Sequence, residues 1–199
     1  MPDVDVWIVH LDAEIEWPPP TAGEADRAAR FVSEPLRRRY LRSHAALRVI
    51  LRSYTSASPD FSLGEHGKPY LAAEPALQFN LSHSGELALV AVARETEIGV
   101  DVEHFRPMRD CMAIAERFFP PLEAAALAEV PAEHREVEFH RRWTRIEARL
   151  KATGIGLYGA SAEPEGDWSV VPLNVGNEYA ASVAARCGML TPHLRNYPA

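Results

Sequence analysis

The sequence predicts an α+β fold, and three observations support this class. Segments with the alternating pattern of strands are mixed with helical patterns, without the regular alternation of a doubly wound sheet. The 199 residues, 47% of them hydrophobic and 25% charged, suffice for one domain or two small ones with real cores. The low hydrophobicity and high charge that are typical of disordered chains are absent.

The first half of the chain predicts strands around one long basic helix. Between Arg27 and Arg52 there are eight arginines and a single acid, a net charge of +7 by count. Apolar residues in this stretch recur at steps of three, four and seven, which predicts a helix with one apolar stripe. Strand patterns and turn residues around it predict strands at 4–10, 78–81, 87–93 and 97–103, loops at 17–20 and 64–70, and a turn at 82–86.

The second half predicts three helices followed by two short strands. The helical patterns cover residues 110–119, 121–130 and 137–153, and strands at 168–171 and 178–184 finish the chain. We place a boundary near residue 104, so that residues 1–104 form an N-terminal α+β lobe and residues 105–199 a C-terminal one.

Several protein classes are excluded by what the sequence lacks. The first ten residues contain acids and no basic run, so they do not form a secretory signal, and no stretch of 18 apolar residues predicts a membrane span. Cys111 and Cys187 have neither the number nor the spacing of a disulfide framework or a metal site. We therefore expect a soluble cytoplasmic protein without nucleic-acid or membrane partners.

Two carboxylates share one face of the predicted strand at 97–103. With a period of two, Ile98 and its apolar alternates point one way, while Gly99, Asp101 and Glu103 point the other. At roughly 7 Å and an effective dielectric of about 20, the two acids repel by about 2 kcal/mol, which a bound divalent cation reverses. Oxygen ligands on a rigid strand suit magnesium. The alternative is a half-exposed strand with an ordinary polar face.

A second candidate pair lies on the helix at 137–153. Glu147 and Lys151 are one turn apart, beside the apolar stripe rather than opposite it. Glu147 is therefore a candidate third metal ligand, and Lys151 a candidate to neutralise a phosphate. The alternative is a helix-stabilising surface pair worth about 0.2–0.5 kcal/mol.

Two further segments offer groups for binding an anion. Ser82 and His83 are expected in a turn, where a histidine is free to donate to an anion. A serine nucleophile with His83 as its base is disfavoured, because adjacent residues rarely face each other and no G-x-S-x-G elbow surrounds them. The loop Gly67, Lys68, Pro69 allows a close backbone approach to a ligand and supplies one charge.

Taken in order, these pieces resemble the Sfp-type 4'-phosphopantetheinyl transferases. The matching motifs are Gly67-Lys68-Pro69, Phe79-Asn80-Leu81-Ser82-His83-Ser84, Ile98-Gly99-Val100-Asp101-Val102-Glu103, Arg117-Phe118-Phe119 with Glu123, and Trp143-Thr144 followed by Glu147, Ala148, Lys151, Ala152, Gly154, Gly156 and Leu157. The arginine-rich helix resembles the basic N-terminal helix of the family.

The resemblance implies that the chain transfers the phosphopantetheine arm of coenzyme A to a serine of an apo acyl or peptidyl carrier protein. It further implies two similar, pseudo-symmetric α+β lobes in one monomeric chain, with coenzyme A and magnesium in the cleft between them. The carrier class, whether of fatty acid, polyketide, peptide or acid-reductase type, stays open.

The resemblance also assigns roles to residues. Asp101, Glu103 and Glu147 would hold the metal, and Glu147 would also be the candidate base for the incoming serine. The implied catalytic set is Glu147, Lys151, Asp101 and His83. The implied coenzyme A ligands are Arg39, Arg42, His44, Gly67, Lys68, Pro69, Ser82, His83 and Lys151, with Lys151 and His83 on phosphate oxygens and the loop at Lys68 on the adenosine and its 3'-phosphate.

Two positions depart from the family pattern. Ile146 stands where the family has a lysine, and His44 where it has an arginine, so we expect an active enzyme with a weaker hold on coenzyme A. Two alternatives remain open: a module that binds coenzyme A or a carrier without transfer, and a magnesium-dependent phosphohydrolase.

Overall fold

The computed structural model describes residues 3–56, 60–64, 66–155 and 166–198 of the chain. Its elements confirm an α+β fold. In order they are β1 (Val4–His10), α1 (Ala22–Ala28), α2 (Glu34–Arg52), β2 (Phe61–Leu63), β3 (Pro69–Leu71), β4 (Leu77–Ser84), β5 (Leu87–Arg94), β6 (Ile98–His104), α3 (Cys111–Phe118), α4 (Pro121–Ala128), α5 (Ala132–Thr153), β7 (Ser169–Pro172), β8 (Tyr179–Ala185) and β9 (His193–Tyr197).

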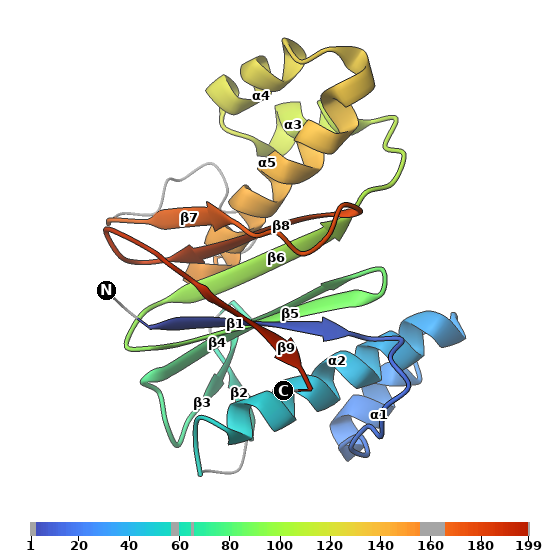
Figure 1. Cartoon of the computed structure of the whole chain (residues 1–199), viewed down its shortest axis with the longest axis vertical. Coiled ribbons are helices and arrows are strands. Elements are labelled where there is room, and N and C mark those ends of the chain that lie inside the picture. The colour runs from blue at the N-terminus through green and yellow to red at the C-terminus, as the bar shows by residue number, and fades with distance from the viewer. Residues whose placement is uncertain (1–2, 57–59, 65, 156–165, 199) are drawn as a thin grey trace.

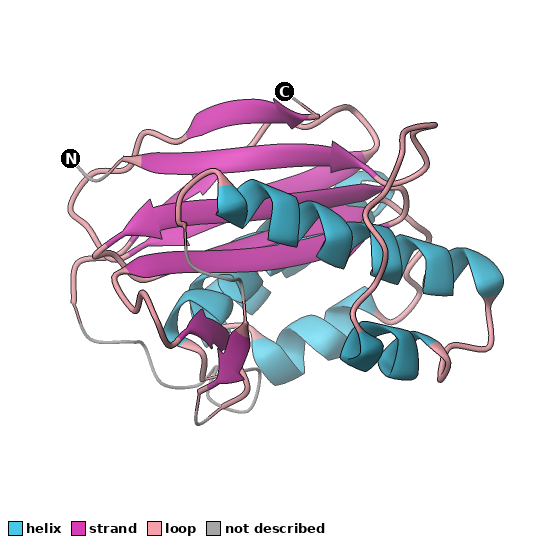
Figure 2. Ribbon diagram, turned by 90° about the horizontal axis from the view of Figure 1, so that it is seen from below, coloured by secondary structure: helices cyan, strands magenta, loops and turns pink. Residues whose placement is uncertain are grey.

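Two sheets are stacked face to face, and a helix covers the outer face of each (Figure 1). The larger sheet has the strand order β4-β5-β1-β9, and the smaller one has the order β6-β8-β7. Helix α2 lies across the larger sheet, with the β2–β3 hairpin to one side of it (Figure 2). Helix α5 covers the smaller sheet and also packs against α3 and α4.

The core between the sheets confirms the predicted facing of β6. Val100 of β6 packs there with Val6 of β1 and Leu89 of β5, and all three side chains are fully buried. Gly99, Asp101 and Glu103 therefore face the other way, toward α5. The apolar alternation of this strand marks the face that lies between the sheets, while Gly99 and Asp101 on the other face are also buried, beneath α5.

Helix α5 lies in direct contact with β6 at Gly99. A Cβ atom on Gly99 would stand 2.1 Å from the carbonyl oxygen of Ala148 and 2.4 Å from the amide nitrogen of Ala152. The small side chains of Ala148 and Ala152, both buried, complete this close approach. Because the two elements touch here, Asp101, two residues along β6, comes to lie under the last turns of α5.

The predicted long basic helix is confirmed as α2, whereas the first arginine of the basic stretch lies on a separate short helix. Arg27 belongs to α1, which begins with a capping box between Thr21 and Glu24. Helix α2 then begins at Glu34, with a proline in its first turn.

The chain does not finish with β8, contrary to the sequence-based expectation. Strand β9 returns to the larger sheet and pairs in parallel with β1, where it takes the edge position. Most of its residues are exposed, so it lacks the apolar alternation from which the other strands are predicted. Backbone pairing and the bond from Arg195 Nε to Asp5 Oδ1, 2.6 Å long, hold it instead.

Candidate active site

Strand β4 carries Ser82, His83 and Ser84 as part of the sheet, not in the turn that the sequence suggested. The strand pairs with β5 along its whole length, from Leu77 to Ser84. The reversal takes place at Gly85, whose φ of 58° suits glycine. Polar residues continue this strand because Ser82 and Ser84 find hydrogen-bond partners on β6.

Three predicted site residues meet in one hydrogen-bonded cluster. Lys151 Nζ of α5 lies 2.6 Å from Asp101 Oδ1 and donates to Ser82 Oγ at 2.9 Å. Ser82 Oγ in turn donates to Asp101 Oδ1 at 2.9 Å. Lys151 is thus paired with a carboxylate on β6, not with Glu147 one turn before it on the same helix.

Two carboxylate oxygens in this region are buried without a hydrogen-bond partner. They are Oδ2 of Asp101 and Oε1 of Glu147. Burial raises the pKa of Asp101 above its usual value, although Lys151 opposes the shift. Burial also raises the pKa of Glu147, and the negative charge of Asp101 adds to the effect. The protein itself therefore does not supply enough positive charge or hydrogen bonds to offset the burial of these two carboxylates.

The chemistry of these groups fits a divalent cation. Unpartnered carboxylate oxygens from Asp101 and Glu147, with Glu103 on the same strand face as Asp101, supply the hard ligands that magnesium prefers. A buried polar atom without a partner is costly, and a cation would provide one. The residues predicted as metal ligands thus suit the proposed metal, although Glu103 Oε2 is also bonded to Ser84.

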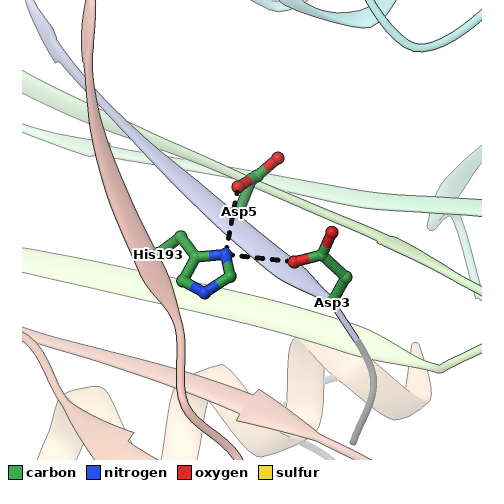
Figure 3. Close-up of side chains that lie close together, drawn as sticks. All are labelled: Asp3, Asp5 and His193. Carbon is green, nitrogen blue, oxygen red and sulfur yellow. Dashed lines mark ion pairs between the residues drawn. The ribbon is translucent and has the colours of Figure 1, made fainter.

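A different group brings its ligand atoms closer together. Among the described residues, Asp3, Asp5 and His193 place three potential ligand atoms within 4.8 Å of one another (Figure 3). Asp5, however, already accepts hydrogen bonds from Arg195 and from the hydroxyl of Tyr54. The guanidinium supplies the positive charge that a metal would bring, so this group serves to hold β9 against β1.

A cavity of about 540 Å³ adjoins the cluster, between α1, α2, β3 and β4. Six of the predicted coenzyme A ligands line it: His44, Gly67, Pro69, Ser82, His83 and Lys151. A second cavity of about 230 Å³ shares Gly67, Pro69 and Lys151 with the first and adds Lys68 and Glu147. The structure therefore brings the motifs of β3, β4 and α5 together around two cavities that share lining residues.

Both histidines of the larger cavity have lowered pKa values. Burial lowers the pKa of His44, whose Nδ1 lies 3.0 Å from the carbonyl oxygen of Tyr40. Partial desolvation by the cavity walls lowers the pKa of His83, and the nearby His44 and Lys151 lower it further, although part of its ring stays open to solvent. The neutral form of each ring is thus favoured until an anion enters.

Lys68 lines the smaller cavity, but its amine is bonded to main-chain carbonyls. Nζ donates to Ala152 at the end of α5, at 2.7 Å, and to Ile98 at the start of β6, at 3.0 Å. Burial lowers the pKa of Lys68 to about 8. The amine satisfies a carbonyl that the last turn of a helix leaves without a partner.

Arg39 and Arg42 are also bonded within the chain and line neither cavity. Arg39 Nη2 lies 2.6 Å from Asp12 Oδ2 and 3.1 Å from Glu86 Oε1. Arg42 Nη1 donates to the carbonyl oxygen of Leu11 at 2.6 Å. The bidentate contact with Asp12 raises the pKa of Arg39 and lowers that of Asp12.

Arg27 is a cavity residue that reasoning from the sequence did not single out. It lies on α1, lines the larger cavity with Tyr40 and His44, and has no ion-pair partner within the described part of the chain. The sequence signal was present, since Arg27 belongs to the basic stretch. Only the fold shows that it faces the cavity while Arg39 and Arg42 contact Asp12 and the carbonyl of Leu11.

Three positions and the membrane question complete the comparison with the sequence. Ile146 packs in the apolar cluster of α3, α4 and α5 and lines neither of the two cavities, and its effect on coenzyme A binding stays a prediction. Gly156 and Leu157 lie outside the described residues. Among the described helices, none has the length and apolar character needed to cross a membrane.

Comparisons with known proteins indicate one family. Residues 97–187 match the model of the 4'-phosphopantetheinyl transferase superfamily. The 4'-phosphopantetheinyl transferase HetI of Nostoc sp. is 43% identical over 143 residues, which are 69% of this chain and 60% of the relative. AcpT, a 4'-phosphopantetheinyl transferase of Escherichia coli K12, is 38% identical over 120 residues, or 60% of each chain.

The matched stretch spans only part of several relatives. It covers 60% of HetI and 57% of a putative 4'-phosphopantetheinyl transferase of Synechocystis sp.. The 4'-phosphopantetheinyl transferase of Bacillus subtilis is covered more fully: it is 33% identical over 154 residues, 70% of this chain and 67% of the relative. On these matches, the chain belongs to the 4'-phosphopantetheinyl transferase superfamily.

Proposed function

We propose that this protein transfers the 4'-phosphopantetheine arm of coenzyme A to a serine hydroxyl of an apo acyl or peptidyl carrier protein. The observation that supports it most is the meeting of Asp101, Glu147 and Lys151 beside a cavity lined by Ser82 and His83. The relatives' names indicate the same reaction. The activity is that of a holo-[acyl-carrier-protein] synthase type transferase.

The reaction is a displacement at phosphorus. The serine oxygen of the carrier bonds to the β-phosphorus of coenzyme A, and the bond from that phosphorus to the bridging oxygen breaks. Adenosine 3',5'-bisphosphate leaves with the electron pair, and the serine proton passes to a base. Such a reaction needs neutralised charge and in-line positioning more than it needs a nucleophile from the protein.

The residues around the cavity match these needs. Glu147, which lines the smaller cavity next to Lys151 and has an oxygen without a hydrogen-bond partner, is the candidate to accept the serine proton. Lys151 and His83 neutralise the pyrophosphate, and Arg27, which has no ion-pair partner among the described residues, reaches the same cavity from α1.

Asp101, Glu103 and Glu147 would hold a magnesium ion. When bound, magnesium would supply positive charge against the pyrophosphate. The lobes of residues 1–104 and 105–199, with pseudo-symmetry and a site in the cleft between them, remain part of the proposal, as do a monomeric state and a cytoplasmic location.

The decisive measurement is a mass assay. The protein is incubated with coenzyme A, Mg²⁺ and a panel of apo carrier proteins, and one carrier class should gain the mass of one phosphopantetheine. No gain with any carrier, together with tight binding of coenzyme A, would instead indicate a binding module. Release of phosphate without a carrier would indicate a phosphohydrolase.

Asp101→Ala provides the site-specific arm of this assay. Removing the carboxylate leaves Lys151 without its partner and deletes a metal ligand, so transfer should fall at least 100-fold. Full activity of the Asp101→Ala protein would exclude the metal role assigned to this residue.

A further inference from the structure

Strands β4 and β6 are edge strands of two different sheets, and they lie side by side. An edge strand presents unpaired backbone N–H groups, which need partners when they are buried. Along β6, the N–H groups of Val100, Val102 and His104 point toward β4. They donate, in that order, to Asn80 Oδ1 at 2.9 Å, Ser82 Oγ at 3.4 Å and Ser84 Oγ at 3.1 Å.

The row formed by Asn80, Ser82 and Ser84 thus replaces a backbone ladder with side chains. Its period of two matches the pleat of both strands, so that each acceptor meets every second N–H group. We refer to these three residues as the polar row of β4.

The two serines of the polar row make a second contact that Asn80 does not make. Ser82 Oγ donates its proton to Asp101 Oδ1 at 2.9 Å, and Ser84 Oγ donates its proton to Glu103 Oε2 at 2.9 Å. A hydroxyl has one proton. Because a backbone N–H group already occupies an acceptor position of each oxygen, that proton is directed toward the carboxylate.

We propose that Ser84 is a positioning residue that holds Glu103 in the orientation of a metal ligand, as Ser82 does for Asp101. The inference rests on the metal role of these carboxylates in the proposed function. Each serine of the polar row accepts a bond from the backbone of β6 and donates one to a carboxylate of β6, so the alignment of the two strands also fixes the orientation of the carboxylate. For Asp101 the bond engages Oδ1, while Oδ2 remains buried and without a partner, as a ligand atom awaiting a cation would be.

The test compares Ser84→Ala with Asn80→Ala, using Mn²⁺ alone as the probe and electron paramagnetic resonance to count free ions. Each variant removes the acceptor of one backbone N–H group of β6, but only Ser84→Ala also removes a second bond to β6, the one to the Glu103 carboxylate. We expect Ser84→Ala to raise the Kd for Mn²⁺ about tenfold. Asn80→Ala should change it less than twofold while lowering the melting temperature to a similar degree.

Two further variants guard against a merely structural loss. Ser84→Thr keeps the hydroxyl and should keep most of the Mn²⁺ affinity. Ser84→Cys replaces the hydroxyl with a weak donor of similar size and should lose part of that affinity. The cysteine variant provides the test if Ser84→Ala does not fold. In a Glu103→Gln background, Ser84→Ala should have no additional effect on Mn²⁺ binding. Equal Kd values for wild type and the alanine or cysteine variant would overturn the proposal.

This readout is independent of transfer. If Ser84 controls Mn²⁺ affinity but no carrier gains mass, the proposed activity fails and the positioning role stands. If carriers gain mass but the wild-type protein binds no Mn²⁺, the positioning role fails and the activity stands.

Discussion

Glu147 illustrates how a candidate catalytic residue lowers the stability of the fold that holds it. Its carboxylate has a buried oxygen without a partner and a raised pKa, because of burial and the nearby charge of Asp101. A group whose folded pKa is raised binds more protons in the folded state between the two pKa values. Its contribution to stability is therefore lost as the pH rises through the acidic range and stays lost at neutral pH.

Glu147→Gln should stabilise the metal-free protein by about 1 kcal/mol at pH 7, because it removes the buried charge. The gain should shrink as the pH falls toward about 4, where the wild-type carboxyl becomes protonated. Thermal melts of both proteins in the presence of a chelator, from pH 4 to 8, measure this. A wild-type protein more stable than the variant at pH 7 would contradict it, and the variant should transfer no phosphopantetheine.

Lys68 shows that a side chain in a matching motif can have other partners than the motif implies. Family resemblance assigns it to the adenosine 3'-phosphate, whereas its amine is bonded to Ala152 and Ile98. These bonds join the β2–β3 hairpin side of the cavity to α5, one residue beyond Lys151.

Lys68→Met should therefore lower kcat about tenfold with coenzyme A and with 3'-dephospho-coenzyme A alike, because it loosens the turn that carries Lys151. The ratio of the two KM values should stay unchanged. A phosphate ligand would behave differently: its loss would raise the KM for coenzyme A alone and bring the ratio close to one. Steady-state kinetics with the two substrates separate the two outcomes.

At the scale of elements, the contact between β6 and α5 sets the geometry of the site. Gly99 permits it, because any side chain would overlap the backbone of α5 at Ala148 and Ala152. The glycine of the motif is thus explained by close approach of two backbones rather than by an unusual φ.

Gly99→Ala should lower the free energy of unfolding by about 3 kcal/mol and transfer activity with it, since α5 must move away from Asp101. Gly188→Ala is the matched control: its Cβ would meet nothing within 4 Å, so a change below about 0.5 kcal/mol is expected. Urea denaturation of the two variants makes the comparison, and equal stabilities would refute the assigned role of Gly99.

Elements buried on an apolar face were predictable, and those held by tertiary hydrogen bonds were not. Strand β5 and helix α5 follow from their apolar spacing, although α5 begins at Ala132, earlier than the predicted 137. Strand β9 and the end of β4 escaped prediction, because Arg195 and the polar row of β4 bond to residues far away in the sequence. A local window holds no information on such partners.

At the scale of the whole molecule, β9 joins the two ends of the chain. It follows β8 of the smaller sheet and pairs with β1 of the larger one. One strand from the second half of the chain thus belongs to the sheet formed by the first half. The division into two lobes near residue 104 stays a prediction.

Deleting residues 189–199 should lower the melting temperature by several degrees and expose the edge of β1, which promotes edge-to-edge association. Arg195→Ala should cost less, because the backbone pairing of β9 remains, and it should leave the protein monodisperse. Thermal melts combined with light scattering test both statements. A truncated protein that melts and scatters like the full chain would show that β9 adds nothing to the sheet.

The sequence motifs predicted which residues belong to the candidate site, but not how those residues pair. The motifs predict five site residues that the fold brings together around the two cavities: Asp101, Glu147, Lys151, Ser82 and His83. The ion pairs could not be predicted from the sequence. Lys151 pairs with Asp101 and Arg39 with Asp12, whereas Arg27 has no charged partner among the described residues. Pairing depends on distances between elements, which composition does not contain.

The arginines of α1 and α2 illustrate the same limit for electrostatics. Acids outside the basic stretch offset part of its excess charge. Asp12 contacts Arg38, Arg39 and Arg42, Glu86 also contacts Arg39, and Glu24 of α1 pairs with Arg48. The field that a distant partner meets is consequently weaker than the count suggests. Encounter with the proposed carrier should then depend only mildly on ionic strength, and recognition should rest on short-range contacts.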